Sequence, residues 1–306
     1  MQNTNHHIVI CFGEVLWDIL PSGAVPGGAP MNVAYHLHKL QKNPALITRI
    51  GDDEKGKQLK QIFSSKGVCT DFFQTDPEHE TGKVYSKANN QHEVVYDIVQ
   101  PVAWDFISWN QSTNDAVADA EYFIFGSLAS RNDISRNTLF QLLESAHKKV
   151  LDINLRQPHF NQKIIEELIS KADFLKLNLA ELELISGWYS HFIDLKDKAK
   201  TLMDKFHLAK MVVTLGANGA ILFWEGKEYQ HNGYSVNVKD TIGSGDAFLA
   251  GIISKWIDNS SSESSLQFAT GLGAFIATKT GGCPDYKVEE IENFISKMSD
   301  TKDFKS

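Results

Sequence analysis

The sequence DTIGSGD occupies residues 240–246 and is followed by the apolar run AFLAGII at residues 247–253. The apolar run predicts a helix whose first turn contains Asp246. Gly243 and Gly245 let backbone N–H groups turn toward one point, and the helix N-terminus adds partial positive charge there. The segment therefore predicts an anion-binding site at the start of a helix.

Asp246 is expected at the edge of this anion site, where a negative charge is electrostatically unfavourable. A general base would explain a carboxylate at this place, because it could take a proton from an alcohol that attacks a phosphoryl group. The alternative is that Asp240 or Asp246 caps the helix, which is a common role of aspartate. The residues alone leave both interpretations open.

The composition limits the classes of function. The chain has 306 residues, which suits one large α/β domain or two modest ones. Its net charge of -8 argues against a nucleic-acid-binding surface, because such surfaces are basic. An acidic protein that binds an anion must do so locally, through amides, a metal ion or single cations.

The cysteines Cys11, Cys69 and Cys283 are far apart and odd in number. This pattern predicts reduced thiols in a cytoplasmic protein rather than a disulfide framework. The first residues lack the basic and apolar segments of a secretory signal, so we expect none. No apolar run approaches the ~18 residues of a membrane span, so we expect no membrane association.

Short apolar runs alternate with helical patterns along the chain. The runs expected to form buried strands are 8–12, 44–50, 120–125, 149–153, 174–177 and 210–215. The expected helices are 31–40, 55–66, 135–146, 162–171 and 195–206. This alternation predicts an α/β fold with a parallel sheet covered on both faces, in which ligands bind beyond the carboxyl ends of the strands.

Two segments interrupt this alternation. Residues 82–99 have the alternating pattern of a β-hairpin, and residues 14–24 have a second β pattern. A small sheet inserted into an α/β domain could act as a lid over the active site. The alternative is an ordinary hairpin at the edge of the main sheet.

Residues 27–34 read GGAPMNVA and combine a glycine pair with a predicted helix start. Gly28 permits close approach of the backbone, and Asn32 offers a donor and an acceptor to a hydroxylated ligand. Asp18 comes shortly before and can accept hydrogen bonds from sugar hydroxyls. These residues predict a polyol-binding site, and the alternative is a tight turn that starts a helix.

Residues 51–57, GDDEKGK, resemble the phosphate-binding P-loop GxxxxGK[ST]. However, Gln58 replaces the hydroxyl residue that would bind Mg²⁺, and the acidic residues of the segment would repel phosphates. We therefore predict a strand-to-helix turn here and no phosphate site.

Polar side chains also follow predicted strands, where α/β sheets bind ligands. Arg156 ends the segment DINLR at 152–156 and can bind a phosphate in bidentate fashion, although a surface ion pair would also explain it. Thr214 and Gly216 lie in VVTLGANGA, residues 212–220, and could approach a nucleotide. A plain β-hairpin is the preferred local interpretation of that segment.

Asn178 and Glu181 follow the predicted strand at 174–177 and are three residues apart, so they share a helical face. A carboxylate and an amide oxygen can hold the waters around a Mg²⁺ ion. The alternative is an ordinary helix start, which such pairs often form.

Taken together and in this order, these segments resemble the PfkB/ribokinase family of carbohydrate kinases. GGAPMNVA at 27–34 is similar to the N-terminal signature of the family, and DTIGSGDAFLAG at 240–251 is similar to its highly specific C-terminal signature. Residues 28–30 and 154–156 are most similar to fructokinases. The resemblance covers nearly the whole chain. It implies one ribokinase-like domain over residues 1–306, a three-layer sandwich with a central, mostly parallel sheet and a small β-sheet lid from about 14–24 and 82–105.

The resemblance implies ATP-dependent phosphorylation of a sugar hydroxyl, with D-fructose as the expected sugar. It assigns Asp246 as the base, and the backbone of Gly243, Ser244 and Gly245 as the anion hole. Ser244 replaces the commoner alanine, a change that should leave the direction of the amide intact.

The resemblance also implies roles for the remaining polar residues. The residues expected to bind the sugar are Asp18, Gly28, Asn32 and Arg156. Asn178 and Glu181 are expected to organise ATP and water-bound Mg²⁺. Thr214 and Gly216 are expected to lie near ATP. A monovalent cation such as K⁺ is expected at Asp240 and the backbone of Ile242, with further ligands from around residues 276–282.

Other functions stay open at this point. Within the family, ribose, 2-keto-3-deoxygluconate or a nucleoside could be the substrate. A non-catalytic sugar-binding regulator could share the scaffold, but it need not keep Asp246 and the glycine pair. A nicotinamide dehydrogenase would need GxGxxG after the first strand, and FGEVLW at residues 12–17 lacks it. An exposed lid sheet could also pair two copies into a homodimer.

Overall fold

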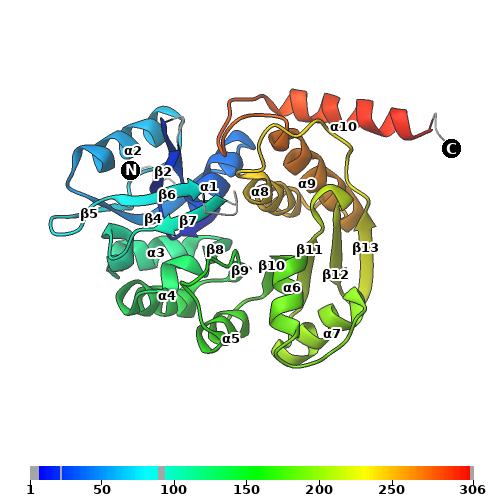
Figure 1. Cartoon of the computed structure of the whole chain (residues 1–306), viewed down its shortest axis with the longest axis horizontal. Coiled ribbons are helices and arrows are strands. Elements are labelled where there is room, and N and C mark those ends of the chain that lie inside the picture. The colour runs from blue at the N-terminus through cyan, green and yellow to red at the C-terminus, as the bar shows by residue number, and fades with distance from the viewer. Residues whose placement is uncertain (1–6, 21–22, 89–93, 304–306) are drawn as a thin grey trace. The chain divides into compact units, whose positions relative to one another are not determined.

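The computed structural model describes residues 7–20, 23–88 and 94–303 of the chain. The chain divides into two compact units, and Figure 1 labels the helices and strands along it. The first unit takes in Met1–His38 and Asn43–His147, and the second takes in Lys39–Lys42 and Lys148–Ser306.

The part of the main sheet described in the first unit consists of four parallel strands. In spatial order they are β8 (Tyr122–Gly126), β1 (Val9–Phe12), β4 (Pro44–Gly51) and β5 (Phe73–Asp76). Every residue of β1 is fully buried, and because successive side chains point to opposite faces, both faces of the strand are covered. Apolar, β-branched residues therefore suit these central strands.

Helices of the first unit follow the strands, and α2, α3 and α4 begin at side-chain caps. They are α1 (Ala29–Lys39), α2 (Glu54–Ser65), α3 (Gln111–Asp119) and α4 (Asp133–Ser145), with short 3-10 turns at η1 (Ala103–Phe106) and η2 (Leu128–Ser130). Asp53, Asn110 and Asn132 cap α2, α3 and α4, each through a side-chain oxygen that accepts a backbone N–H bond. The segment 51–57 is thus a strand-to-helix turn, as predicted from its sequence.

The second unit also contains a sheet. Its spatial order is β13 (Lys227–His231), β12 (Ala220–Trp224), β11 (Lys210–Thr214), β10 (Phe174–Asn178) and β9 (Lys148–Asp152). The strands β9, β10 and β11 are parallel, while β12 and β13 continue the sheet as antiparallel hairpin strands. The local interpretation of residues 212–220 as a hairpin is therefore confirmed, with its turn at η3 (Gly216–Asn218).

In the described part of the second unit, six helices accompany this sheet. They are α5 (Gln162–Ser170), α6 (Leu179–Ser186), α7 (Leu195–Phe206), α8 (Ser244–Ile257), α9 (Ser262–Ala277) and α10 (Val288–Asp303). The helices α8 and α9 pack closely because glycine faces alanine at their crossing, where a Cβ added to Gly251 would lie 3.0 Å from the Ala269 Cα.

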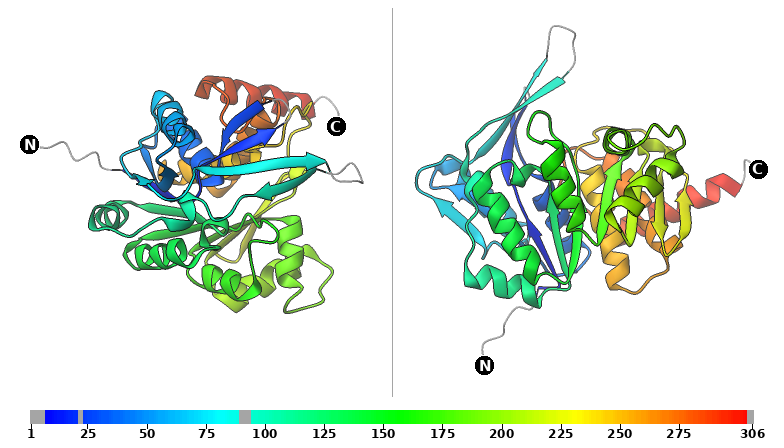
Figure 2. Two further views of the ribbon diagram at one scale, coloured as in Figure 1. Left: turned by 60° about the vertical axis from the view of Figure 1, so that its left-hand side comes forward. Right: turned by 90° about the horizontal axis from the view of Figure 1, so that it is seen from below.

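A separate small sheet belongs to the first unit. Its strands, in spatial order, are β3 (Gly23–Gly27), β2 (Leu16–Leu20), β6 (Gly82–Ala88) and β7 (Val94–Ile98). The central pair β2 and β6 is parallel, and each outer strand is antiparallel to its neighbour. Figure 2 shows β6 and β7 running side by side in cyan. Residues 21–22 and 89–93 of the expected lid ranges lie outside the described residues.

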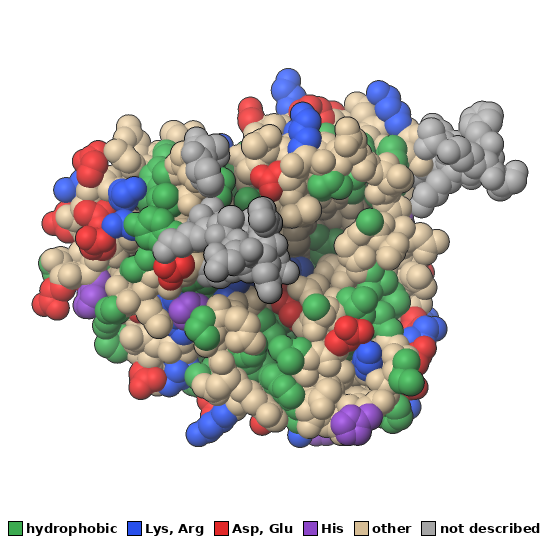
Figure 3. Space-filling view, viewed as in Figure 1, with side chains coloured by type: hydrophobic (Ala, Val, Ile, Leu, Met, Phe, Trp, Pro, Cys, Tyr) green, Lys and Arg blue, Asp and Glu red, His purple; other side chains and the backbone are tan. Residues whose placement is uncertain are grey.

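These elements confirm the predicted α/β class, with mostly parallel strands, flanking helices and a smaller sheet. All the strands and helices expected from the sequence are present. Cys11, Cys69 and Cys283 are free thiols. In the part of the chain that is described, no helix is long and apolar enough to cross a membrane. Figure 3 shows acidic and basic side chains mixed over one face of the protein.

Candidate active site

The start of α8 forms an open turn of backbone amides in the second unit. Its N-cap is Gly243, which has a left-handed backbone with φ 76° and is followed directly by the helix. A Cβ at Gly243 would lie 2.5 Å from the Cα of Gly282, so both the backbone angle and the space require glycine. Among the described residues, no side chain caps this helix. Ser244 N donates to Thr241 O in a long bond of 3.3 Å, and the start of α8 keeps the positive potential that favours an anion.

Asp246 lies in the first turn of α8 and is 9% exposed. It is not the N-cap, because that position belongs to Gly243. Asp240 does not cap α8 either: its carboxylate accepts hydrogen bonds from Ile242 N at 3.0 Å and from Gly281 N at 2.9 Å. Asp240 thus ties its own loop to the segment around residue 281, which is the segment predicted from the resemblance to complete a cation site.

A buried lysine lies next to the α8 turn. Lys176, on β10, places its Nζ 2.7 Å from Asp152 Oδ2 at the end of β9, and both side chains are buried. A Cβ at Gly245 would lie 3.3 Å from this Nζ, so the ammonium is adjacent to the amide turn. Burial disfavours its charge, but the carboxylates of Asp152 and Asp246 outweigh burial and raise the pKa of Lys176.

Lys176 and Asp152 are functional candidates that sequence reasoning missed as a pair. The available signal was a lysine inside the otherwise apolar strand FLKLN at 174–178, because a charged residue seldom lies at a fully buried strand position unless it has a partner. The positive charge of Lys176 supplements the backbone amides at the place where an anion is expected.

Asn178 and Glu181 form a reciprocal cap at the start of α6. Asn178 Oδ1 accepts from Glu181 N at 2.9 Å, and Glu181 Oε2 accepts from Asn178 N at 2.8 Å. The other carboxylate oxygen of Glu181 accepts from Leu155 N at 2.8 Å. Burial raises the pKa of Glu181, and the negative charge of Asp152 raises it further. The hydrogen bonds from the backbone amides of Asn178 and Leu155 act in the opposite direction and offset part of this increase. The pair is thus a helix start, and Glu181 also binds the backbone of the segment that follows β9.

These oxygens fit a Mg²⁺ ion bound through water. Each carboxylate oxygen of Glu181 already accepts an amide, and in the described ranges no group of three or more His, Cys, Asp or Glu side chains could hold a metal directly. Asp152 Oδ1 is buried and accepts no hydrogen bond, so the site contains an unused anionic oxygen. A hydrated Mg²⁺ suits such a sparse set of oxygen donors.

Thr214 and Gly216 lie beside this cap. Thr214 is paired in register with Asn178, so both residues end neighbouring parallel strands. Gly216 has φ 60° and is exposed, and a Cβ built on it would meet nothing within 4 Å. Arg156, by contrast, is exposed and makes no ion pair with any described residue, so the structure does not support the interpretation of a surface ion pair.

Of the predicted sugar-binding residues, Asp18, Gly28 and Asn32 belong to the first unit, whereas Arg156 belongs to the second. Gly28 has φ 120°, and a Cβ there would lie 2.4 Å from the carbonyl oxygen of Glu14. Asn32 N donates to Gly28 O at 2.9 Å, which starts α1, and the Asn32 side chain is 5% exposed. The Asp18 carboxylate lies against Gly27, where an added Cβ would be 2.2 Å from Oδ2. The fold therefore groups Asp18, the glycine pair and the first turn of α1.

Glu14 was not anticipated in this group. It is 3% exposed, and its Oε1 accepts from Ala29 N at 3.2 Å, so it supports the helix start that follows the glycine pair. The sequence signal for it was weak, since Glu14 and Ala29 are far apart in the chain.

The sequence matches the family described as pfkB family carbohydrate kinase over residues 23–288. The chain belongs to the pfkB family of carbohydrate kinases. This carbohydrate kinase is 29% identical over 307 residues to a fructokinase from Vibrio alginolyticus, a match that covers 93% of this chain and 98% of the relative.

Solved structures of similar fold are also sugar kinases. A fructokinase with bound ATP from Xylella fastidiosa superposes with a TM-score of 0.85 at 21% identity, covering 96% of this chain and 99% of that one. A double mutant of a fructokinase from Vibrio cholerae O395, solved with fructose, ADP and a potassium ion, has a TM-score of 0.80 at 23% identity, covering 95% and 99%. These similarities show that this chain has the same fold as the two fructokinases.

Proposed function

We propose that this carbohydrate kinase transfers the γ-phosphoryl group of ATP to a hydroxyl of D-fructose. The observation that carries the proposal is the start of α8, where amides without a side-chain cap adjoin the buried carboxylate of Asp246 and the ammonium of Lys176. Family membership supports the reaction class, and the fructokinase relatives support the sugar.

In this proposal, Asp246 accepts the proton of the attacking hydroxyl. The amides of Gly243, Ser244 and Gly245 stabilise the negative charge that develops on the transferred group, which is where most catalysis of phosphoryl transfer lies. The ammonium of Lys176 adds a fixed positive charge next to Gly245. This charge also offsets the repulsion between Asp246 and the incoming phosphates.

The nucleotide would lie along the strand ends of the second unit. Asn178, Thr214 and Gly216 line these ends, and Glu181 with Asn178 would hold Mg²⁺ through water. When bound, Mg²⁺ supplies charge neutralisation for the phosphates. Asp240 and the backbone of Ile242 would contribute to a K⁺ site. A fructokinase of the same fold was solved with a potassium ion bound.

The sugar would be held by the first unit. Asp18 accepts from hydroxyl groups, Asn32 both donates and accepts, and Gly28 lets the backbone approach the ligand. Arg156 is proposed as a further substrate-binding residue. Ribose, 2-keto-3-deoxygluconate and nucleosides are the alternative acceptors, because hydrogen-bonding groups of this kind suit any of them.

An ADP-release assay over a panel of these acceptors tests the proposal. We expect the highest kcat/KM with D-fructose, and a loss of turnover on chelation that added Mg²⁺ restores. Preference for another acceptor would overturn the choice of sugar, whereas an absence of turnover with every acceptor would favour the sugar-binding regulator.

We also propose a cytoplasmic location and a homodimer formed through the small sheet. The free thiols and the use of ATP support the location. The outer strands β3 and β7 each leave one edge of the small sheet unpaired among the described residues, and such edges can pair with another chain. Sedimentation should give a dimer at about micromolar concentration, and a monomer there would contradict the dimer.

A further inference from the structure

The segment GDDEKG at residues 51–56 has no part in the proposed chemistry, yet it is tightly bonded in the first unit. Asp53 is the N-cap of α2, and its Oδ1 accepts from Gly56 N at 2.7 Å. An N-cap needs only this one bond. The carboxylate of Asp53, however, makes further contacts far along the chain.

Thr81, which directly precedes β6, is bonded to Asp53 twice. Thr81 N donates to Asp53 Oδ2 at 2.8 Å, and Thr81 Oγ1 donates to Asp53 Oδ1 at 2.7 Å. The same hydroxyl accepts from Gly51 N at 3.0 Å, and Thr81 is fully buried. The side chains of Asp53 and Thr81 together therefore join the end of β4, the start of α2 and the start of β6.

The glycines of the segment leave room for this network. A Cβ at Gly51 would lie 2.7 Å from both Asp53 Oδ2 and Thr81 N. A Cβ at Gly56 would lie 2.4 Å from Gly51 O and 2.7 Å from Thr81 Oγ1. Any larger residue at either position would force the threonine away from the carboxylate.

The same turn of α2 also contacts β2. Trp17 Nε1 donates to Lys55 O at 3.1 Å, and Lys55 Nζ lies 5.7 Å from the centre of the Trp17 ring. Trp17 precedes Asp18, and it is paired in register with Lys83 of β6. The two central strands of the small sheet are thus both attached, near their first residues, to the segment at 51–56.

We propose that residues 51–56, which we call the anchor segment, hold the starts of β2 and β6 and thereby position Asp18 for the sugar, with Asp53 as the positioning residue. This inference rests on the proposed role of Asp18 in sugar binding. Because the anchor acts through β2, its loss weakens fructose binding and leaves nucleotide binding, which uses the second unit, nearly unchanged.

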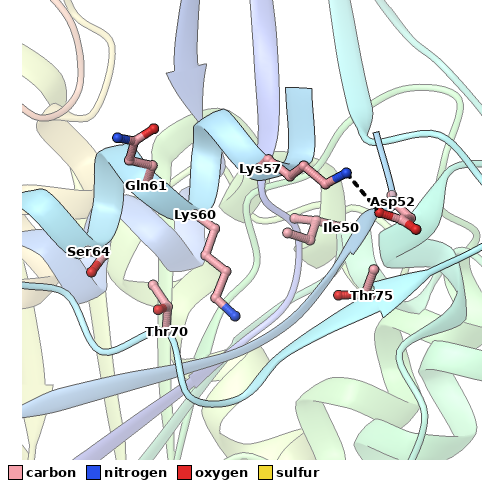
Figure 4. A pocket seen from close by; sticks show the side chains of 9 residues that line it. Ile50, Asp52, Lys57, Lys60, Gln61, Ser64, Thr70 and Thr75 are labelled. Atoms are coloured by element: carbon pink, nitrogen blue, oxygen red, sulfur yellow. Dashed lines mark ion pairs between the residues drawn. The ribbon is translucent and has the colours of Figure 1, made fainter. Parts of the chain in front are cut away.

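The test compares Asp53→Asn with Asp52→Asn in the full-length protein. Asp52 is the matched control, because it belongs to the same segment and is exposed. Among the described residues, its carboxylate forms an ion pair only with Lys57, at 3.2 Å. Figure 4 shows this pair in a surface pocket. We expect Asp53→Asn to raise KM for fructose about tenfold and to change KM for ATP less than about twofold. The reason is that an amide side chain cannot accept all of the hydrogen bonds that the Asp53 carboxylate accepts. Asp52→Asn should match the wild type in both constants.

Thr81 provides a second pair of variants that does not alter the helix cap. Thr81→Ser keeps the hydroxyl and should behave as the wild type, whereas Thr81→Val keeps the shape and should raise KM for fructose as Asp53→Asn does. In the double variant Asp53→Asn/Thr81→Val, the increase should be smaller than the product of the two single increases, because both substitutions weaken the same link between Asp53 and Thr81.

Amide hydrogen exchange tests the anchor without any substrate. Faster exchange in residues 16–20 and 82–85 of Asp53→Asn, with unchanged exchange in β11 and β12, supports the proposal. Wild-type exchange together with a wild-type KM for fructose would overturn it, as would equal increases of KM for fructose and ATP. If the wild-type enzyme does not phosphorylate fructose, the proposed function fails, but the exchange result still decides whether the anchor exists.

Discussion

Replacing Lys176 by methionine is the perturbation whose size follows most directly from the structure. The Lys176 and Asp152 side chains are 9% and 7% exposed and 2.7 Å apart, so the variant leaves a buried carboxylate without its partner. Breaking a buried pair in this way costs about 3–5 kcal/mol. That is a large part of the ~5–15 kcal/mol by which a typical domain is stable. We therefore expect a strongly destabilised second unit.

Urea unfolding, followed by circular dichroism and by hydrogen exchange in β9 and β10, measures this loss. Lys196→Met is the control, because Lys196 and Glu228 form an exposed pair whose loss should leave the unfolding free energy nearly unchanged. The double variant Asp152→Asn/Lys176→Met should be more stable than Lys176→Met, since it removes the unpaired charge. A Lys176→Met protein as stable as the wild type would refute the reasoning.

The pH dependence of this difference has a definite sign. The surrounding carboxylates outweigh the effect of burial and raise the pKa of Lys176 above its ordinary value of 10.5. The stabilisation is therefore complete below that value and is lost as the pH rises through the higher, folded-state pKa. The difference between wild type and Lys176→Met should be equal at about pH 7 and 9 and smaller at about pH 11.

Two further predictions concern the α8 turn and the anchor segment. Gly243→Ala should lower kcat at least ~100-fold, because its Cβ would lie 2.5 Å from the Gly282 Cα and would displace the amides; a normal kcat would show that the turn is not used. Burial opposes ionisation of Asp53, but the bonds from Thr81 and Gly56 outweigh it and lower the pKa of Asp53 below 3.8. Its stabilisation is thus present above that pH and lost on acidification through the folded-state pKa, so Asp53→Asn should flatten the acid part of the stability curve, as measured by circular dichroism.

The sequence predicted the central elements well for a physical reason. Strands buried on both faces, such as β1 and β11, must be continuously apolar, and that pattern can be seen in one sequence. The short strand β5, with sequence FQTD, was missed because it pairs only with β4 in the first unit and is partly exposed, so nothing requires an apolar run there.

The site was predictable where its parts are local. The glycines and Asp246 of the α8 turn are contiguous, and their geometry follows from one helix start. The pair of Asp152 and Lys176 joins residues 24 apart, on two strands whose register no local pattern shows. The bonds from Thr81 to Asp53 likewise span 28 residues. Contacts of this kind exist only once the sheet is assembled.

The central claim is that Asp246 is the general base at an anion site made by the start of α8. The most direct test is kcat of Asp246→Asn with D-fructose and ATP, together with the dissociation constants of both ligands. We predict that kcat falls by a factor of about 10²–10⁴ while both dissociation constants stay within about threefold of the wild type. A variant that folds, binds both ligands and keeps the wild-type kcat would contradict the account.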